Sequence, residues 1–226
     1  MNGLGLYLVC FIVPLVIGFA VQGWLKSTFA RNNQIAVASG MSGAEVARRI
    51  LDGNGLQGVP VQQAKGGPLS DHYDPRTRGV YLSEPVYRGR SVAATAVAAH
   101  EVGHAIQHAR SYAPMTVRAA IWPVAAFGSQ AWFFILLAGL VFGAFGLVQL
   151  ALVVFAAVIV FQLVTLPVEF NASRRALAQI RELGLVNDAE AGGARSTLTA
   201  AAMTYVAAAL ASIAQLMYFL AIFGRN

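Results

Sequence analysis

The segment HEVGH at residues 100–104 has residue types and a spacing that suit metal chemistry. On a helix, residues i and i+4 share one face, so His100 and His104 can bind one Zn²⁺ together. Glu101 is then placed to act as general base toward a water activated by the metal. The motif predicts a zinc hydrolase and favours a peptidase.

The sequence around the motif predicts the helix that it requires. Residues 91–109 are rich in alanine and contain no proline, and Ser91 is a suitable N-cap. Residues 93–99 are small and apolar, which indicates a buried helix. Two histidines and a glutamate on such a helix need polar partners.

A catalytic zinc usually has three protein ligands and one position for water. His108 extends the histidine series, but eight residues of helix span ~12 Å and a Zn–N bond is only ~2.1 Å long. His108 therefore cannot join both other histidines. His72 lies in the polar stretch 70–74 and is either a donor on the substrate side or an exposed turn residue.

Glu169 is the stronger candidate for the third ligand. It is the first charged residue after fifty uncharged ones and stands between Val168 and Phe170. An acid at a membrane boundary usually has a partner. The alternative is that Glu169 pairs with Arg174 or Arg175 along the chain.

The composition predicts an integral membrane protein. The 226 residues are 57% hydrophobic and 12% charged, with a mean hydropathy of +0.60. Three stretches carry no Asp, Glu, Lys or Arg, and the middle one is long enough for two spans of ~20 residues, with a turn at 143–146. The predicted spans are 4–23, 119–141, 147–166 and 199–222.

The basic residues predict the orientation. Fifteen of the sixteen Lys and Arg lie in 26–118 or 169–195, which places both segments in the cytoplasm and both termini outside. No Lys or Arg precedes the first apolar core, so it is expected to be an uncleaved anchor rather than a signal peptide. The net charge of +6 follows from this orientation and predicts contact with the lipid bilayer, not with nucleic acid.

Cys10 is the single cysteine and lies in the first predicted span. One cysteine excludes an intramolecular disulfide and a metal site rich in thiolates. The expected metal chemistry therefore rests on His and Glu.

The cytoplasmic part shows a short α+β pattern before the metal helix. A capping box at Ser42 and Glu45 predicts a helix that ends near Gly53, and 59–63 and 79–83 predict strands separated by a turn at 74–77. This order predicts a zincin-like core. Residues 79–83 are expected to be either the edge strand that pairs with an extended peptide or a purely structural strand.

The predicted fold is therefore a mainly α integral membrane protein with four transmembrane helices and a small α+β zincin-like cytoplasmic domain that carries the HExxH helix. Its predicted parts are a first transmembrane helix (1–23), a catalytic domain (24–118), a transmembrane hairpin (119–166), a cytoplasmic segment with the third metal ligand (167–198), and a fourth transmembrane helix with a tail (199–226).

Four blocks of sequence resemble a known family. HEVGHAIQ at 100–107, LPVEFNASRRAL at 166–177, LTAAAMTYVAAAL at 198–210 and DHYDPRTRGVYLSEPVY at 71–87 are similar to segments of the bacterial YugP-type membrane zinc metallopeptidases. The order of HExxH, membrane hairpin and glutamate is more distantly similar to the prenyl-protein and heat-shock-linked membrane metallopeptidases.

The resemblance implies a multi-pass protein of the bacterial inner membrane with a gluzincin-like site that faces the cytoplasm. His100, His104 and Glu169 would be the zinc ligands and Glu101 the catalytic acid/base. One departure concerns the residues that orient the ligands. The family has an acid where this chain has Asn171, and the distant relatives have an Asp where this chain has Ser173.

The expected function is zinc-dependent cleavage of membrane-associated or misfolded proteins at the cytoplasmic face. The donor for the tetrahedral oxyanion stays open among four residues: His72, Tyr73, Tyr81 and Tyr87. The alternative is a non-catalytic scaffold in which zinc stabilises the domain and a partner protein binds. A membrane protein partner or a homo-oligomer is compatible with either function.

Overall fold

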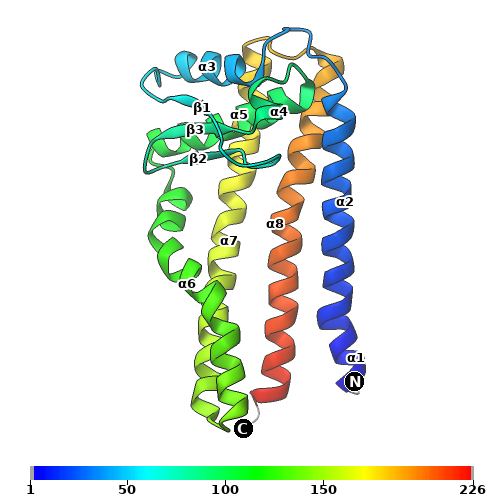
Figure 1. Cartoon of the computed structure of the whole chain (residues 1–226), viewed down its shortest axis with the longest axis vertical. Coiled ribbons are helices and arrows are strands. Elements are labelled where there is room, and N and C mark those ends of the chain that lie inside the picture. The colour runs from blue at the N-terminus through cyan, green and yellow to red at the C-terminus, as the bar shows by residue number, and fades with distance from the viewer. Residues whose placement is uncertain (1–2, 225–226) are drawn as a thin grey trace. The chain divides into compact units, whose positions relative to one another are not determined.

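The computed structural model describes residues 3–224, which are mostly helical with one small sheet (Figure 1). The outermost residues of the first and last predicted segments, 1–2 and 225–226, lie outside the described part. In chain order the elements are α1 (Gly3–Tyr7), the π-helix η1 (Leu8–Ile12), α2 (Val13–Asn33), α3 (Gly43–Gly53), β1 (Val61–Gln63), β2 (His72–Asp74), β3 (Gly79–Leu82), α4 (Glu84–Tyr87), α5 (Val92–Ala109), α6 (Ala113–Val141), α7 (Phe145–Glu182) and α8 (Asp188–Phe223).

Within the described residues, four helical segments are long and apolar enough to cross a membrane. Each predicted span falls on one of them: Gly5–Asn33, Ala113–Val141, Phe145–Glu182 and Asp188–Phe223. The predicted hairpin turn is also present, because the backbone leaves the helix after Val141 and Gly143 adopts a φ of +63°. Gly146, however, already belongs to α7.

The predicted segment 167–198 is built from the extended ends of α7 and α8. Pro167 does not end α7, which continues to Glu182, and α8 begins at Asp188. Residues 172–182 are mainly Ala, Arg, Leu, Gln and Glu, which favour helix. As a result Glu169 stands on a continuous helix rather than on a loop.

The chain forms two compact units. The first comprises Met1–Gln22, Thr116–Pro167 and Thr204–Asn226. It contains a small core of Leu136, Val148 and Ala151, beside which Trp132 stacks on Phe155 with ring centroids 4.2 Å apart.

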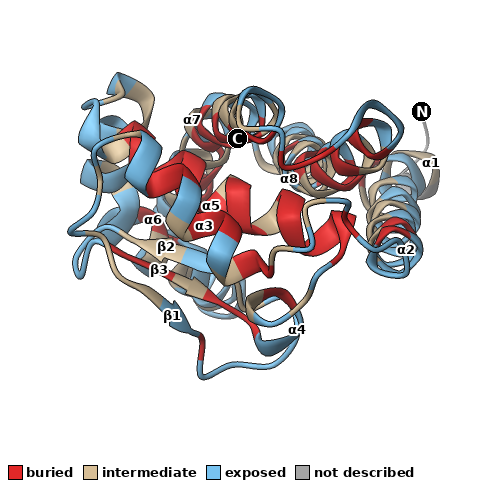
Figure 2. Cartoon of the chain, turned by 90° about the horizontal axis from the view of Figure 1, so that it is seen from above, coloured by how far each residue is buried: buried red, intermediate tan, exposed pale blue. Residues whose placement is uncertain are grey.

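The second unit comprises Gly23–Met115 and Val168–Met203 and has the larger core. The buried faces of α3, β3 and α5 meet there with the ends of α7 and α8, and Figure 2 shows the buried residues along α5. The capping box predicted at Ser42 is present, with the Ser42 side chain bonded to the Glu45 backbone and the Glu45 carboxylate bonded back. It begins α3, which packs on α5.

The sheet has the strand order β1-β3-β2, with β1 parallel and β2 antiparallel to β3. The prediction that 79–83 is an edge strand is therefore wrong, because β3 is the central strand. Gly79, Val80 and Leu82 are buried, as a central strand requires. The polar stretch 70–74, in which an exposed turn was one interpretation of His72, contributes the strand β2. An edge strand exposes one side to solvent and tolerates polar residues.

Candidate metal centre

The histidines of the motif stand on α5, whose start is fixed by Ser91. The Ser91 hydroxyl accepts a hydrogen bond from the Ala94 backbone at 3.1 Å. One helical turn separates His100 from His104, so the two rings are neighbours, with centroids 4.7 Å apart and planes at 84°. His104 is buried and His100 is half-buried.

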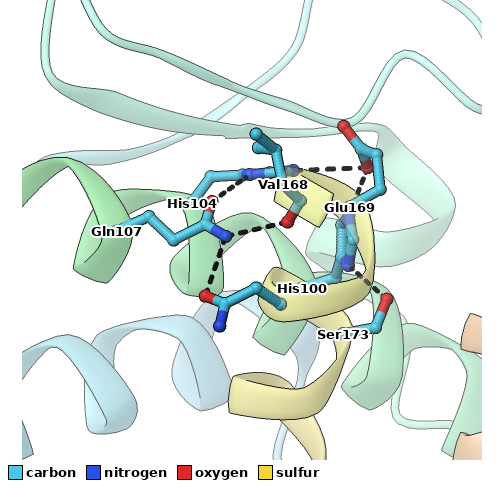
Figure 3. A network of polar contacts seen from close by, with 7 residues as sticks. His100, His104, Gln107, Val168, Glu169 and Ser173 are labelled. Carbon is cyan, nitrogen blue, oxygen red and sulfur yellow. Dashed lines mark hydrogen bonds and ion pairs between the residues drawn. The ribbon is translucent and has the colours of Figure 1, made fainter. Parts of the chain in front are cut away.

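Glu169 of α7 lies against both imidazoles (Figure 3). Its Oε2 atom is 3.2 Å from His100 Nε2 and 3.6 Å from His104 Nε2. Potential ligand atoms of the three residues all lie within 4.8 Å of one another. Residues separated by almost seventy positions in the sequence therefore converge on one point.

The spacing of the Glu169 oxygen from each of the two histidine nitrogens fits a zinc ion. Tetrahedral coordination with bonds of ~2.0–2.1 Å places neighbouring donors roughly 3.3 Å apart. The two nitrogen–oxygen distances of 3.2 and 3.6 Å lie on either side of that value. Two imidazoles with one carboxylate also form a donor set that zinc prefers.

Gln107 fixes the orientation of the His104 ring. Its Oε1 atom lies 3.0 Å from His104 Nδ1, and its amide nitrogen donates to the Val168 carbonyl at 2.8 Å and to Asn171 Oδ1 at 3.0 Å. Because the amide nitrogen is used as a donor, Oε1 is the acceptor and His104 Nδ1 carries the proton. The lone pair of His104 is then on Nε2, which faces Glu169.

Ser173 occupies the corresponding place beside His100. Its hydroxyl lies 3.2 Å from His100 Nδ1, one helical turn beyond Glu169. Both histidines thus have a polar partner on the ring nitrogen that faces away from the carboxylate, as is usual for metal-binding histidines.

Asn171 contacts Gln107, which in turn contacts His104. Its Oδ1 atom accepts hydrogen bonds from the Gln107 amide and from Arg175 Nε at 2.7 Å. The polar contacts to the two histidine rings therefore come from Ser173 and Gln107, and Asn171 contacts Gln107; their role in orienting metal ligands stays a prediction. Arg175 bonds to Asn171 here; the alternative that Glu169 pairs with Arg174 or Arg175 stays a prediction.

Glu101 is buried and lies beside this group. Burial raises the pKa of its carboxyl group, the charges of Glu169 and Asp71 raise the pKa further, and the two histidines oppose both effects. Among the described residues, none donates a hydrogen bond to its carboxylate. Such a group is suited to accept a proton from a substrate water.

The remaining sequence candidates lie on the sheet side of α5. His72 is exposed, bonds to the Ser70 carbonyl at 2.8 Å and stacks on Tyr81 at 5.0 Å. The Tyr81 hydroxyl bonds to Thr77. These contacts do not distinguish between the candidates for the oxyanion donor, and its identity stays a prediction.

His108 has a structural partner rather than a place in the group. Its Nδ1 atom lies 2.8 Å from the Tyr73 hydroxyl, which ties β2 to the end of α5. Tyr73 is thereby engaged with α5, while Tyr87 packs against the core.

Sequence reasoning did not assign roles to Gln107 or Gly103. Gln107 follows His104 by three residues and so shares its helix face, a spacing that the sequence shows. Gly103 lies against the Ala172 backbone of α7, a contact that only the folded structure shows.

The fold and site together define a helical membrane protein with a group of two histidines and one glutamate suited to zinc. Residues 7–224 match the model of the family described as "Putative neutral zinc metallopeptidase", and the chain belongs to this family. It is 47% identical over 223 residues to the "Putative membrane protease YugP" of Bacillus subtilis (strain 168), a match that covers 98% of this chain and 99% of the relative. No solved structure gives a significant match.

Proposed function

We propose that this protein is a zinc-dependent endopeptidase that hydrolyses membrane-associated or misfolded proteins at the cytoplasmic face of the bacterial inner membrane. The observation that carries the proposal is the convergence of His100, His104 and Glu169 beside the buried carboxylate of Glu101. The family and the name of the relative support a protease.

The chain's own residues supply the acid–base chemistry. Glu101 takes a proton from the attacking water and returns it to the leaving amine. His100, His104 and Glu169 would hold the zinc, with Gln107 and Ser173 fixing the two rings. When bound, zinc supplies a Lewis acid that acidifies water and polarises the scissile carbonyl.

The extended substrate would pair with β2. Strand β3 is already bonded on both sides, whereas β2 is bonded only to β3 within the sheet. The Tyr73–His108 contact places β2 beside the helix that carries the motif. Addition of a peptide strand to this edge would give backbone recognition with little dependence on sequence, which suits misfolded substrates.

The cytoplasmic location rests on the distribution of charge. Eleven Lys and Arg lie in 26–118 and four in 169–195, on either side of the hairpin 119–166. The four apolar helices and the name of the relative support a multi-pass membrane protein. Cysteine-labelling of both loops in intact and opened cells tests which side they face.

The experiment for catalysis compares three forms of the full chain in detergent: the unchanged protein, Glu101→Gln and Glu169→Gln. Zinc content is measured for each, together with cleavage of casein as an unfolded substrate. We expect about one zinc per unchanged chain, retained zinc without cleavage in Glu101→Gln, and loss of both in Glu169→Gln.

Two outcomes contradict the proposal. Cleavage retained by Glu101→Gln removes that residue from the chemistry. Stoichiometric zinc with a closed shell of four protein ligands and no cleavage by the unchanged protein favours the scaffold instead.

A further inference from the structure

A hollow between the ends of α7 and α8 combines positive charge with apolar surface. Its volume is about 320 Å³. We call it the arginine groove; the residues that line it are Phe170, Ser173, Arg174, Leu177, Arg181, Arg195, Leu198, Thr199 and Ala202. All of them belong to the second compact unit.

The charge of the groove has one sign. Arg174, Arg181 and Arg195 are exposed, and no acidic residue is among the lining residues. Ion pairs within the described part of the chain engage other arginines, such as Arg48 with Asp52, and leave these three uncompensated. Three arginines from two helices therefore line a space of ligand size, where an anionic group would neutralise their charge.

The lining between the arginines is apolar. Leu177 and Leu198 face the hollow from α7 and α8, and Phe170 and Ala202 lie toward the uncharged parts of the same helices. A ligand that matches this lining carries an anionic head and a hydrocarbon portion. A free anion would contact the arginines but leave the apolar lining unused.

The position along the helices indicates the source of such a ligand. Arg174 follows the last residue of the uncharged stretch 119–168 by six residues, which is about 9 Å of helix. Arg195 directly precedes the uncharged stretch 196–224. On both helices the arginines thus begin where the apolar span ends, at the depth of lipid headgroups.

We propose that the arginine groove binds the phosphate of an anionic membrane phospholipid, with the lipid's hydrocarbon against Phe170, Leu177, Leu198 and Ala202. Arg174, Arg181 and Arg195 bind the phosphate through charge-assisted hydrogen bonds. Lipid binding at this groove does not depend on peptidase activity.

The test measures binding of phosphatidylglycerol to the full chain in a neutral detergent, with phosphatidylcholine as the reference lipid. The groove variant is Arg174→Gln/Arg181→Gln/Arg195→Gln. The matched control is Arg49→Gln/Arg76→Gln/Arg88→Gln, which removes the same charge from exposed arginines elsewhere. We expect the unchanged protein to prefer phosphatidylglycerol, and the groove variant alone to lose at least about tenfold in affinity.

Zinc content and elution volume report whether each variant is folded. If the triple variant is not folded, the three single substitutions decide the question, each being expected to weaken phosphatidylglycerol binding more than Arg49→Gln does.

Other outcomes overturn the proposal. Equal losses in the groove variant and the control show that net charge alone attracts the lipid. Inorganic phosphate that competes as well as the lipid, at equal concentration, assigns the groove to a free anion. Binding of an acidic peptide that depends on the three arginines, without lipid binding, assigns it to protein ligands.

Discussion

Gly103 of α5 lies directly against the backbone of Ala172 in α7. A Cβ atom placed on Gly103 would stand 2.7 Å from the Ala172 carbonyl oxygen, closer than side-chain carbons approach backbone. This contact is one residue from His104 and three from Glu169. The distance between the helix faces that carry His104 and Glu169 is therefore set by the absence of a side chain at position 103.

Replacement of Gly103 by Ala should push α7 away from the histidines. We expect weaker zinc binding and a free energy of unfolding lower by about 1–3 kcal/mol, because backbone rather than a flexible side chain must move. Gly192→Ala is the control, since no atom lies within 4 Å of its added Cβ; it should be neutral or stabilising by up to about 1 kcal/mol. Zinc affinity and thermal unfolding in detergent measure both effects, and unchanged zinc affinity in Gly103→Ala would contradict the argument.

Gln107→Met should lower zinc affinity about 10–100-fold, because His104 loses the acceptor that fixes its ring. The substitution keeps the volume but also removes the bonds to Val168 and Asn171 that join α5 to α7. Competition with a coloured chelator measures the affinity. Gln62→Met, at an exposed position of β1, serves as control and should behave like the unchanged protein.

Two substitutions of Ser173 should show whether its hydrogen bond to His100 supports zinc binding. Ser173→Ala leaves His100 Nδ1 without its contact and should weaken zinc binding. Ser173→Asp supplies a charged acceptor and should bind zinc at least as tightly as the unchanged protein. If Ser173→Asp lowers zinc affinity as much as Ser173→Ala does, the size of the side chain at this position matters more than its hydrogen bonding.

Zinc binding should weaken as the pH falls. Burial lowers the pKa of His104, but the hydrogen bond and the charge of Glu169 outweigh burial and raise this pKa above its ordinary value of 6.5. Below that raised pKa, zinc must displace a proton, so its apparent affinity should fall by about tenfold per pH unit for each proton released. Chelator competition between about pH 6 and about pH 8 checks this; an affinity that is flat or rises toward acid would contradict it.

The sequence could predict the features that depend on local pattern. The HExxH spacing places His100 and His104 on one helical face, whatever the rest of the chain does. The Ser42 and Ser91 caps were recognisable because capping depends on neighbouring residues alone. The apolar stretches likewise predicted the spans, since crossing a bilayer requires length and hydrophobicity rather than particular partners.

The order of the strands in the sheet could not be predicted from the sequence pattern. Residues 79–83 showed strand character, but only the pairing with Val61 on one side and His72 on the other makes β3 central. Hydrophobic alternation reports which residues are buried, not how many neighbouring strands a strand has.

Glu169 depends on both local sequence pattern and tertiary packing. The sequence singled it out as an acid at the end of an uncharged stretch, but its approach to 3.2 Å from His100 depends on how α5 packs against α7. That packing rests on Gly103 against Ala172 and on Gln107 bonded across the two helices. Residue types and helical period thus determined the chemistry available to the chain, whereas the convergence of donors separated by almost seventy residues came from tertiary packing, because no local pattern encodes a distance between two helices.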